Sequence, residues 1–146
     1  MLMFDLGMIR WTRKHTFSWR NFLRHRRKGE SIIDCCAAPG GKTLYIASLL
    51  SGQGMVYAID INEGRLRILK EMAKLHQVDG VITTIHVDMH SYTDNNAMKC
   101  DTVLLDAPCS GLHVLPKGRL TLEQWRLEDM EELKNLQDEL LDFASR

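Results

Sequence analysis

Four aspartates follow four short apolar runs of the chain, and a cysteine lies close behind the last of them. The aspartates are Asp34, Asp60, Asp88 and Asp106, and the cysteine is Cys109. A lone aspartate after a strand is more often a turn former or a helix cap than a functional group. Four of them, one after each strand, are harder to explain in this way, because the carboxyl ends of parallel strands meet in one ligand crevice. The pattern therefore predicts a carboxylate-lined binding site with a thiol beside it.

The first aspartate is followed by a turn that suits a nucleotide-like ligand. Residues 31–43 read SIIDCCAAPGGKT, so an apolar strand breaks at a Pro-Gly-Gly turn and a helix begins at Lys42. Glycines let a ligand approach the backbone, and the helix N-terminus offers unpaired N–H groups. Asp60 lies 19 residues after Gly41, which is close to the spacing at which an acidic residue binds ribose hydroxyls. Asp88, after the third strand, is placed to reach an adenine edge.

Two common nucleotide-binding motifs do not fit this turn. A phosphate-binding P-loop needs a glycine four intervening residues before Gly-Lys-Thr, where this chain has Cys36. A dinucleotide site would have the GxGxxG pattern, whereas here only Gly40 and Gly41 are present. An adenosine ligand without a pyrophosphate fits better, and we predict S-adenosylmethionine (SAM), with its methionine end at the turn.

Apolar runs alternate with helical patterns along the chain. This alternation predicts an α/β fold with a parallel sheet and helices on both faces. The predicted strands span residues 32–36, 55–59, 81–87 and 102–105, and the predicted helices span residues 42–50, 63–77 and 121–144.

The 146 residues correspond to about one domain, and the formal net charge is zero. The charge is uneven, because residues 1–30 contain eight Lys and Arg against Asp5 and Glu30, a net of 8 − 2 = +6. We expect residues 1–30 to be a disordered or atypical basic leader; a nucleic-acid-binding arm and an organellar targeting segment stay open as alternatives. Residues 31–146 are expected to form the N-terminal part of a SAM-dependent catalytic domain.

The four cysteines match neither a disulfide framework nor a zinc spacing. They favour a reducing compartment, which could be the cytoplasm, the nucleolus or an organelle. No stretch is long and apolar enough to cross a membrane, so we expect no membrane partner. Because the cysteines lack a zinc spacing, we also expect no metal. The oligomeric state is open.

Several of these stretches together resemble the RNA (cytosine-5)-methyltransferases of the NOL1/NOP2/Sun group, to which the bacterial Fmu and RsmB type belongs. They are DCCAAPGGKT at 34–43, VYAIDIN at 56–62, VD at 87–88 and LLDAPCSGL at 104–112. The resemblance implies a Rossmann-like class I SAM-dependent methyltransferase fold. It also implies methyl transfer from SAM to C5 of cytosine in RNA, more often ribosomal RNA than transfer RNA.

The resemblance also implies a role for each motif. The residues that would wrap the methionine and ribose of SAM are Cys36, Ala37, Ala38, Pro39, Gly40, Gly41 and Lys42. Asp60 would bind the ribose hydroxyls, and Asp88 would lie by the adenine. Asp106 would lie near the methyl-transfer point and the target base. C5 of cytosine is a poor nucleophile until a thiolate adds to C6; in this group one cysteine makes that attack, and another, here Cys109, assists release of the product.

The chain departs from the group's pattern after Leu112. No cysteine follows Cys109, whereas the group has its nucleophilic cysteine in a later motif after the fifth strand. We therefore expect a truncated chain with about four of the seven strands, and an exposed apolar edge at strand 102–105 or 81–87. A catalytically inactive SAM- or RNA-binding fragment stays open as the alternative. A methyltransferase for amino groups fits less well, because such enzymes have Asp/Asn-Pro-Pro-Tyr/Phe where this chain has Asp-Ala-Pro-Cys.

Overall fold

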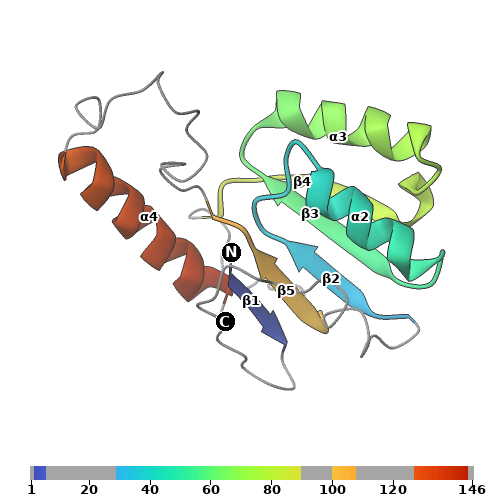
Figure 1. Ribbon diagram of the computed structural model, residues 1–146, viewed down its shortest axis with the longest axis horizontal. Helices are drawn as coiled ribbons and strands as arrows, with labels where there is room; N and C mark the ends of the chain where they lie inside the picture. Colours follow the sequence, from blue (N-terminus) through green and yellow to red (C-terminus); the bar gives the residue numbers. More distant parts are fainter. Residues whose placement is uncertain (1, 6–28, 90–99, 108–126, 145–146) are drawn as a thin grey trace, which may run out of the picture.

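The computed structural model describes residues 2–5, 29–89, 100–107 and 127–144, and in this part of the chain five strands form one sheet (Figure 1). The strands are Leu2–Asp5 (β1), Ser31–Asp34 (β2), Met55–Asp60 (β3), Ile82–His86 (β4) and Thr102–Leu105 (β5). The helices are Gly41–Leu50 (α2), Glu63–Leu75 (α3) and Leu127–Ala144 (α4), with a short 3-10 turn at Asp79–Val81 (η1). The order across the sheet is β1-β5-β2-β3-β4.

Strands β2 to β5 are parallel, as the sequence predicted. From β2 the chain runs through α2 to β3 and through α3 to β4, and it then returns so that β5 lies on the other side of β2. The order of the sheet therefore reverses between β2 and β5. In open α/β sheets such a reversal opens a crevice at the carboxyl ends of the two strands, which is where ligands bind.

Alternate residues of the central strands supply two apolar layers, one on each face of the sheet. On one face, buried strand side chains pack under α2 and α3; the strand and α2 members are Ile32, Val56, Leu104, Ile46, Ala47 and Leu50. On the other face, a second set packs under the C-terminal half of α4; it includes Ile33, Ile59, Val103, Leu105, Leu140 and Ala144. The prediction of helices on both faces is therefore confirmed, and Figure 1 shows α4 apart from the α2 and α3 pair.

The first strand was not predicted from the sequence. β1 pairs antiparallel with β5, in a register that sets Leu2 opposite Leu105 and Asp5 opposite Thr102. Of the two edges expected to be exposed, the one at strand 102–105 is therefore wrong, because β1 occupies it, whereas β4 is the last strand on the other side of the described sheet. The remainder of the basic segment, residues 6–28, lies outside the described residues.

Several element boundaries differ from the prediction by one or two residues, and a local turn explains one of them. The third predicted strand begins at Ile82 rather than Val81, because residues 79–81 form the η1 turn, whose Val81 N–H donates to the Val78 carbonyl. The final helix is described from Leu127, and residues 121–126 of the predicted span lie outside the described residues.

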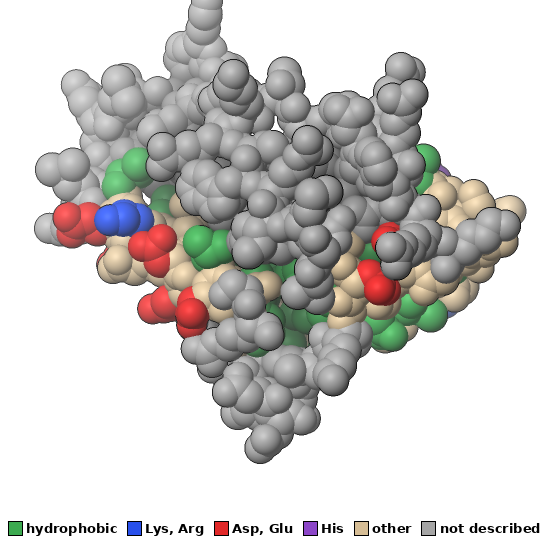
Figure 2. All heavy atoms as spheres, turned by 90° about the horizontal axis from the view of Figure 1, so that it is seen from below, with side chains coloured by type: hydrophobic (Ala, Val, Ile, Leu, Met, Phe, Trp, Pro, Cys, Tyr) green, Lys and Arg blue, Asp and Glu red, His purple; other side chains and the backbone are tan. Residues whose placement is uncertain are grey.

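The exposed side of α4 is acidic, with Lys134 among several carboxylates. Figure 2 shows these acidic side chains beside a basic one at the end of the molecule where α4 lies. Such a surface repels phosphates and does not suit nucleic-acid contact. Within the described residues, none of the helices combines the length and apolar character needed to span a bilayer.

Candidate functional site: a carboxylate-lined cavity at the switch point

The four aspartates gather around one cavity of about 840 Å³ at the carboxyl ends of β2 to β5. This volume lies within the range of small-molecule and cofactor sites. The wall contains Asp34, Asp60, Asp88 and Asp106, and also every residue of the predicted cradle from Cys36 to Lys42. The structure thus brings together all the predicted site residues that it describes. Cys109 lies outside the described residues.

The loop between β2 and α2 is held to its neighbours by its own backbone. The Cys35 N–H donates to the Leu104 carbonyl on β5 at 2.9 Å, and the Ala37 N–H donates to the Ile59 carbonyl on β3 at 3.0 Å. The Ala38 N–H then donates to Asp60 Oδ2 at 3.0 Å. The loop is therefore anchored on both sides of β2 before the helix begins, and it crosses the end of the sheet as one wall of the cavity.

Gly40 makes the turn into α2 possible. Its φ is +111°, in the region that side chains rarely tolerate, and a Cβ there would lie 2.7 Å from Leu69 Cγ of α3. Both the left-handed backbone and the close approach of α3 therefore require glycine. Gly41 is different, because a Cβ on it would meet no atom of the other described elements within 4 Å. The first turn of α2, with its unpaired N–H groups, faces the cavity at this point.

Asp60 is fixed by two backbone donors. Its Oδ2 accepts from the Ala38 N–H at 3.0 Å and its Oδ1 accepts from the Asn62 N–H at 2.9 Å. A carboxylate oxygen can accept more than one hydrogen bond. Each oxygen of Asp60 therefore keeps the capacity to bind a ligand hydroxyl, while the backbone sets the orientation of the carboxylate.

Asp34 is the most deeply buried acid of the site, with 1% of its surface exposed. Its Oδ2 accepts a hydrogen bond of 2.7 Å from the Thr43 hydroxyl, and among the described residues its Oδ1 has no hydrogen-bond partner. Burial raises the pKa of Asp34 from 3.8 to about 6, and the negative charge of Asp106 acts in the same direction. The Thr43 hydroxyl, the Lys42 ammonium and the Cys36 backbone N–H favour the ionised form and offset part of this shift in pKa.

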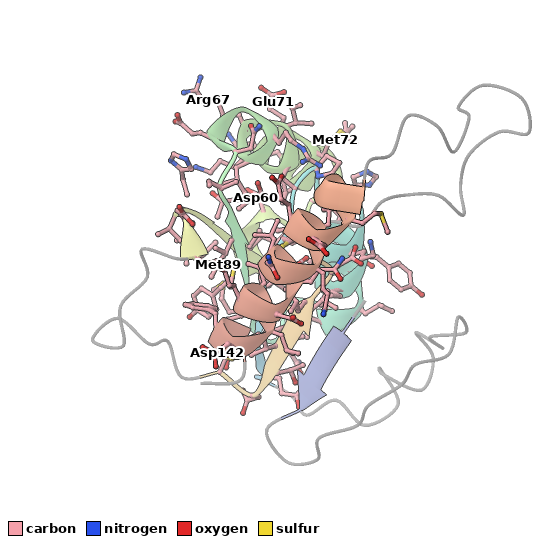
Figure 3. The ribbon with its side chains drawn as sticks, turned by 90° about the vertical axis from the view of Figure 1, so that its left-hand side faces the viewer. Asp60, Arg67, Glu71, Met72, Met89 and Asp142 are labelled. Carbon is pink, nitrogen blue, oxygen red and sulfur yellow. The ribbon has the colours of Figure 1, made fainter. Side chains whose placement is uncertain are left out.

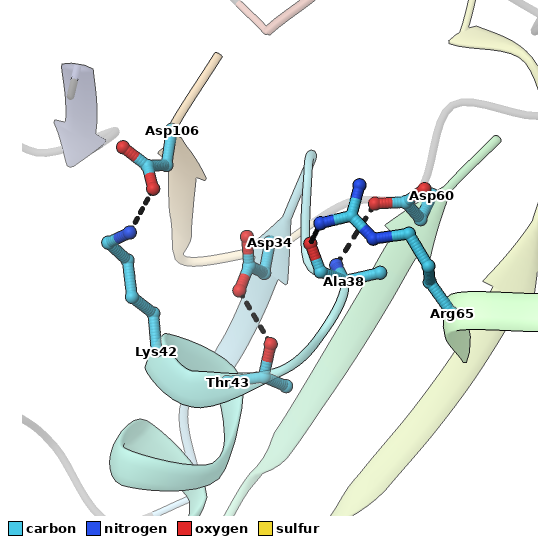
Figure 4. A network of polar contacts seen from close by, with 7 residues as sticks. All are labelled: Asp34, Ala38, Lys42, Thr43, Asp60, Arg65 and Asp106. Carbon is cyan, nitrogen blue, oxygen red and sulfur yellow. Dashed lines mark hydrogen bonds and ion pairs between the residues drawn. The ribbon is translucent and has the colours of Figure 1, made fainter. Parts of the chain in front are cut away.

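Lys42 forms an ion pair with Asp106 across the opening between α2 and β5 (Figure 4). Both side chains are partly exposed to solvent. The pair lies at the switch point, where the predicted methyl-transfer end of the cavity would be. Because Lys42 donates directly to a carboxylate oxygen, the structure gives this lysine a role in orienting Asp106 that the sequence did not indicate.

The three described cysteines are free thiols in the reduced form. Burial raises the pKa of the Cys36 thiol to about 12, with the charges of Asp34 and Asp60 acting in the same direction. Burial also raises the pKa of Cys35, to which Asp34 contributes, and that of Cys100. None of these three thiols has the lowered pKa of a thiolate nucleophile. Cys35 and Cys100 pack in the apolar layer on the α4 side of the sheet and behave as small apolar residues.

Sequence reasoning missed several residues of the cavity wall. Ile61 directly follows Asp60 and is 65% exposed, which is unusual for isoleucine and leaves an apolar surface on the wall. Arg65 of α3 donates to the Ala38 carbonyl. Met89 packs with the α4 layer, on the side shown in Figure 3. Leu136 and Leu140 of α4 close the cavity from the other side. Only Ile61 had a signal in the sequence, as an apolar residue placed between two polar ones.

Comparison with known proteins agrees with this geometry. A sequence profile of the family described as 16S rRNA methyltransferase RsmB/F matches residues 22–146. The chain belongs to this family. The earlier resemblance to RNA cytosine-5 methyltransferases is thereby confirmed, together with the expected SAM-methyltransferase fold.

RsmB/F family relatives act on more than one class of RNA. The chain is 35% identical over 118 residues to ribosomal RNA small subunit methyltransferase F of Aeromonas hydrophila, which covers 81% of this chain and 25% of that protein. It is 40% identical over 114 residues to the 28S rRNA (cytosine-C(5))-methyltransferase of Mus musculus, covering 77% and 14%. It is 43% identical over 91 residues to the tRNA (cytosine(72)-C(5))-methyltransferase of Pyrococcus horikoshii, covering 62% and 23%.

A solved structure has a similar arrangement of elements over most of this chain. The crystal structure of NSun6 from Pyrococcus horikoshii with SFG superposes with a TM-score of 0.65 at 31% identity, over 84% of this chain and 31% of that one. The chain spans about a quarter of the length of the bacterial and archaeal relatives named here.

Proposed function

We propose that this chain binds SAM in the cavity at the switch point and takes part in methyl transfer to C5 of cytosine in RNA. The observation that carries the proposal is the grouping of the cradle from Cys36 to Lys42 with three carboxylates, Asp60, Asp88 and Asp106, around one cavity of an RsmB/F family chain. Ribosomal RNA is the proposed substrate class, because rRNA enzymes are among the relatives of this chain; a tRNA enzyme among them makes tRNA the second substrate to test.

The residues of the cavity fit SAM in shape and in charge. SAM is cationic at its sulfonium and ammonium groups, and the wall has four aspartates, one of which is paired with Lys42. Asp60 would bind the ribose hydroxyls through those lone pairs of its carboxylate oxygens that are not used by the backbone N–H groups. The exposed Ile61 offers an apolar surface to the adenine ring, and Asp88 would hydrogen-bond to the adenine edge. The N–H groups at the start of α2 would bind the methionine carboxylate.

The remaining groups would act on the base. Bound SAM would supply an electrophilic methyl group. The Asp106 carboxyl, oriented by Lys42, would share a proton with N3 of the cytosine and so stabilise the negative charge that develops on the ring during attack at C6. Cys109 is the proposed thiol for release of the methylated base. The raised pKa values of Cys35, Cys36 and Cys100 argue against these three as the thiolate that attacks C6.

The same pKa values favour a second candidate function, which is SAM and RNA binding without turnover. None of the described cysteines is suited to the attack on C6, and Cys109 is the proposed thiol for release, so no cysteine of the 146 residues is assigned to that attack. The two functions differ in turnover but share the cofactor site.

Isothermal titration calorimetry of the 146-residue chain with SAM tests the site. We expect Asp60→Asn to weaken SAM binding at least about tenfold, because an amide accepts fewer hydrogen bonds and lacks the charge. Asp79→Asn, a matched change in the exposed η1 turn, should leave binding unchanged. Equal affinities for the two variants would contradict the proposed site.

Transfer is tested with tritiated SAM and unmodified rRNA and tRNA. Multiple-turnover labelling of cytosine that is lost in Cys109→Ala would support methyl transfer by this chain. SAM binding without label in either RNA would support the second function. Multiple turnover that persists in Cys109→Ala would refute the role of Cys109.

A further inference from the structure

Arg65 connects helix α3 to the cradle loop by one hydrogen bond. Its Nη2 donates to the Ala38 carbonyl at 2.7 Å, and the Ala38 N–H donates to Asp60 Oδ2 at 3.0 Å. Both polar groups of the Ala38 backbone are therefore bound by side chains from the β3–α3 segment. Figure 4 shows the two contacts on either side of Ala38.

The backbone of Arg65, the donor in this contact, is itself held by hydrogen bonds. The Asn62 side chain caps α3 by accepting from the Arg65 N–H at 3.0 Å, and the Asn62 N–H donates to Asp60 Oδ1 at 2.9 Å. Asp60, the cap of α3 and Arg65 thus form one hydrogen-bonded series that begins and ends at Ala38. Because each member fixes the next, the guanidinium reaches Ala38 from a fixed backbone.

The apolar contacts between α3 and the loop at Ala37 and Ala38 lie beside Arg65. Leu66 and Leu69 pack with Ala37 and Ala38 in one buried cluster. These contacts fix the distance between helix and loop, but apolar packing has no direction. The hydrogen bond from Arg65 is directional, and it fixes how the Ala38 carbonyl is turned immediately before the Pro-Gly-Gly turn.

We propose that Arg65 is a positioning residue of the cofactor site, which acts by holding the Ala38 carbonyl and not by contact with the ligand. The proposal rests on the proposed function, since the ligand of this loop is taken to be SAM. A loop that is ordered before the ligand arrives binds more tightly, because the conformational entropy of ordering it is lost on folding rather than on binding.

The test uses variants that keep the length of the side chain. Arg65→Met removes the donors and keeps an apolar stem, whereas Arg65→Lys keeps one charged donor. Arg67→Met is the matched control on the same helix, because Arg67 pairs with Glu63 on the exposed side of α3 at 2.9 Å (Figure 3). Two quantities are measured: amide hydrogen exchange of the ligand-free chain, and the affinity for SAM and for S-adenosylhomocysteine.

We expect Arg65→Met to speed hydrogen exchange of the Ala38 amide. We also expect it to lower the affinity for both ligands about tenfold, which is the effect of losing one charge-assisted hydrogen bond. Arg65→Lys should recover most of both quantities, and Arg67→Met should change neither. Exchange at the Ala37 amide, which bonds to β3, should stay slow in all variants.

Three results would overturn the proposal. Weaker binding with unchanged exchange in the ligand-free chain would mean that Arg65 contacts the ligand directly. Faster exchange that extends to Ala37 would mean a general loss of stability. Unchanged exchange and binding would mean that the contact does not matter. If the wild-type chain binds neither ligand, the proposed function fails, and an unchanged Ala38 exchange rate in Arg65→Met would then overturn the positioning role on its own.

Discussion

The Thr43 hydroxyl donates a hydrogen bond of 2.7 Å to Asp34 Oδ2, and both side chains are shielded from solvent. This bond ties the end of β2 to the first turn of α2 beneath the cradle loop. It satisfies one oxygen of a carboxylate whose other oxygen has no hydrogen-bond partner among the described residues. An ionised Asp34 is therefore poorly compensated, and the folded chain should respond to pH through it.

Asp34 should make the folded state less stable as the pH rises from about 4 to 6. Its pKa is about 6 in the folded state and 3.8 ordinarily, so between these values the folded chain binds more protons than the unfolded chain does. Stability is then fully present below the ordinary pKa, and it falls by about 3 kcal/mol in total as the pH passes the folded pKa. Urea unfolding at a series of pH values should show that Asp34→Asn removes this loss, since the amide cannot ionise.

The comparison of wild type with Asp34→Asn isolates this group from the other carboxylates, which titrate in both chains. Thr43→Val serves as the control for the hydrogen bond. It removes a group that favours the ionised form, so it should raise the pKa of Asp34 further and move the pH-dependent window upward. An identical pH dependence in wild type and Asp34→Asn would show that Asp34 does not titrate in this range.

Gly40 and Gly41 should differ sharply when each is replaced by alanine. Gly40→Ala adds a Cβ at 2.7 Å from Leu69 Cγ on a backbone with φ of +111°, and we expect a loss of about 1–3 kcal/mol in the free energy of unfolding. The Cβ of Gly41→Ala would meet no atom of the other elements that the structure describes within 4 Å, and the change should leave stability unchanged or slightly raised.

Gly41 should matter for SAM binding although it does not matter for stability. If SAM approaches the N-terminus of α2, the added methyl of Gly41→Ala occupies part of its path and should weaken binding without weakening the fold. Urea denaturation and calorimetric titration of both variants check the two effects. Full SAM affinity in a stable Gly41→Ala chain would place the ligand away from this turn.

The described cysteines should be slow to react while the chain is folded. In Cys109→Ser the remaining thiols are Cys35, Cys36 and Cys100. With the Cys36 pKa near 12 instead of 9.0, its reaction with iodoacetamide at pH 8 should be about thirtyfold slower or more, after the greater nucleophilicity of the rarer thiolate is counted.

Mass spectrometry of the labelled peptides, with the urea-unfolded chain as the reference, measures this difference. Labelling of Cys36 in the folded chain at the unfolded rate would show an accessible thiolate in the cradle. Such a result would also contradict the argument against Cys36 as the thiolate that attacks C6.

Strand β1 should tolerate proline at one of two neighbouring positions and not at the other. In an antiparallel edge strand, successive N–H groups point alternately to the partner strand and to solvent. Of Met3→Pro and Phe4→Pro, one therefore removes a hydrogen bond to β5 and the other does not. We expect the first to lower the unfolding midpoint in urea and to promote aggregation through the uncovered edge of β5. Equal effects of the two variants would argue against the β1–β5 pairing.

The sequence determined the parallel part of the fold because its signals are local. Continuous apolar runs specify buried strands, and each helix of the core begins after a turn that its own residues encode, as Asn62 does for α3. The bounds of β5 and the start of β3 agreed with the prediction for this reason. The sequence also predicted that aspartates line the cavity, because they are placed at strand ends and parallel strands end on the same side of the sheet.

The relations that join distant parts of the chain were decided by the tertiary structure alone. The pairing of β1 with β5 spans some hundred residues, and nothing in the four residues of β1, three of them apolar, identifies the strand with which they pair. Arg65 looks in the sequence like any other exposed helix arginine such as Arg67, and only the packing of α3 beside the loop brings it to Ala38. The pKa values of Asp34 and the cysteines likewise depend on burial, which is a sum over neighbours from several elements. Residue types and their spacing thus fixed which groups could bind a cofactor, while long-range packing decided which of them are charged, oriented and within reach of one another.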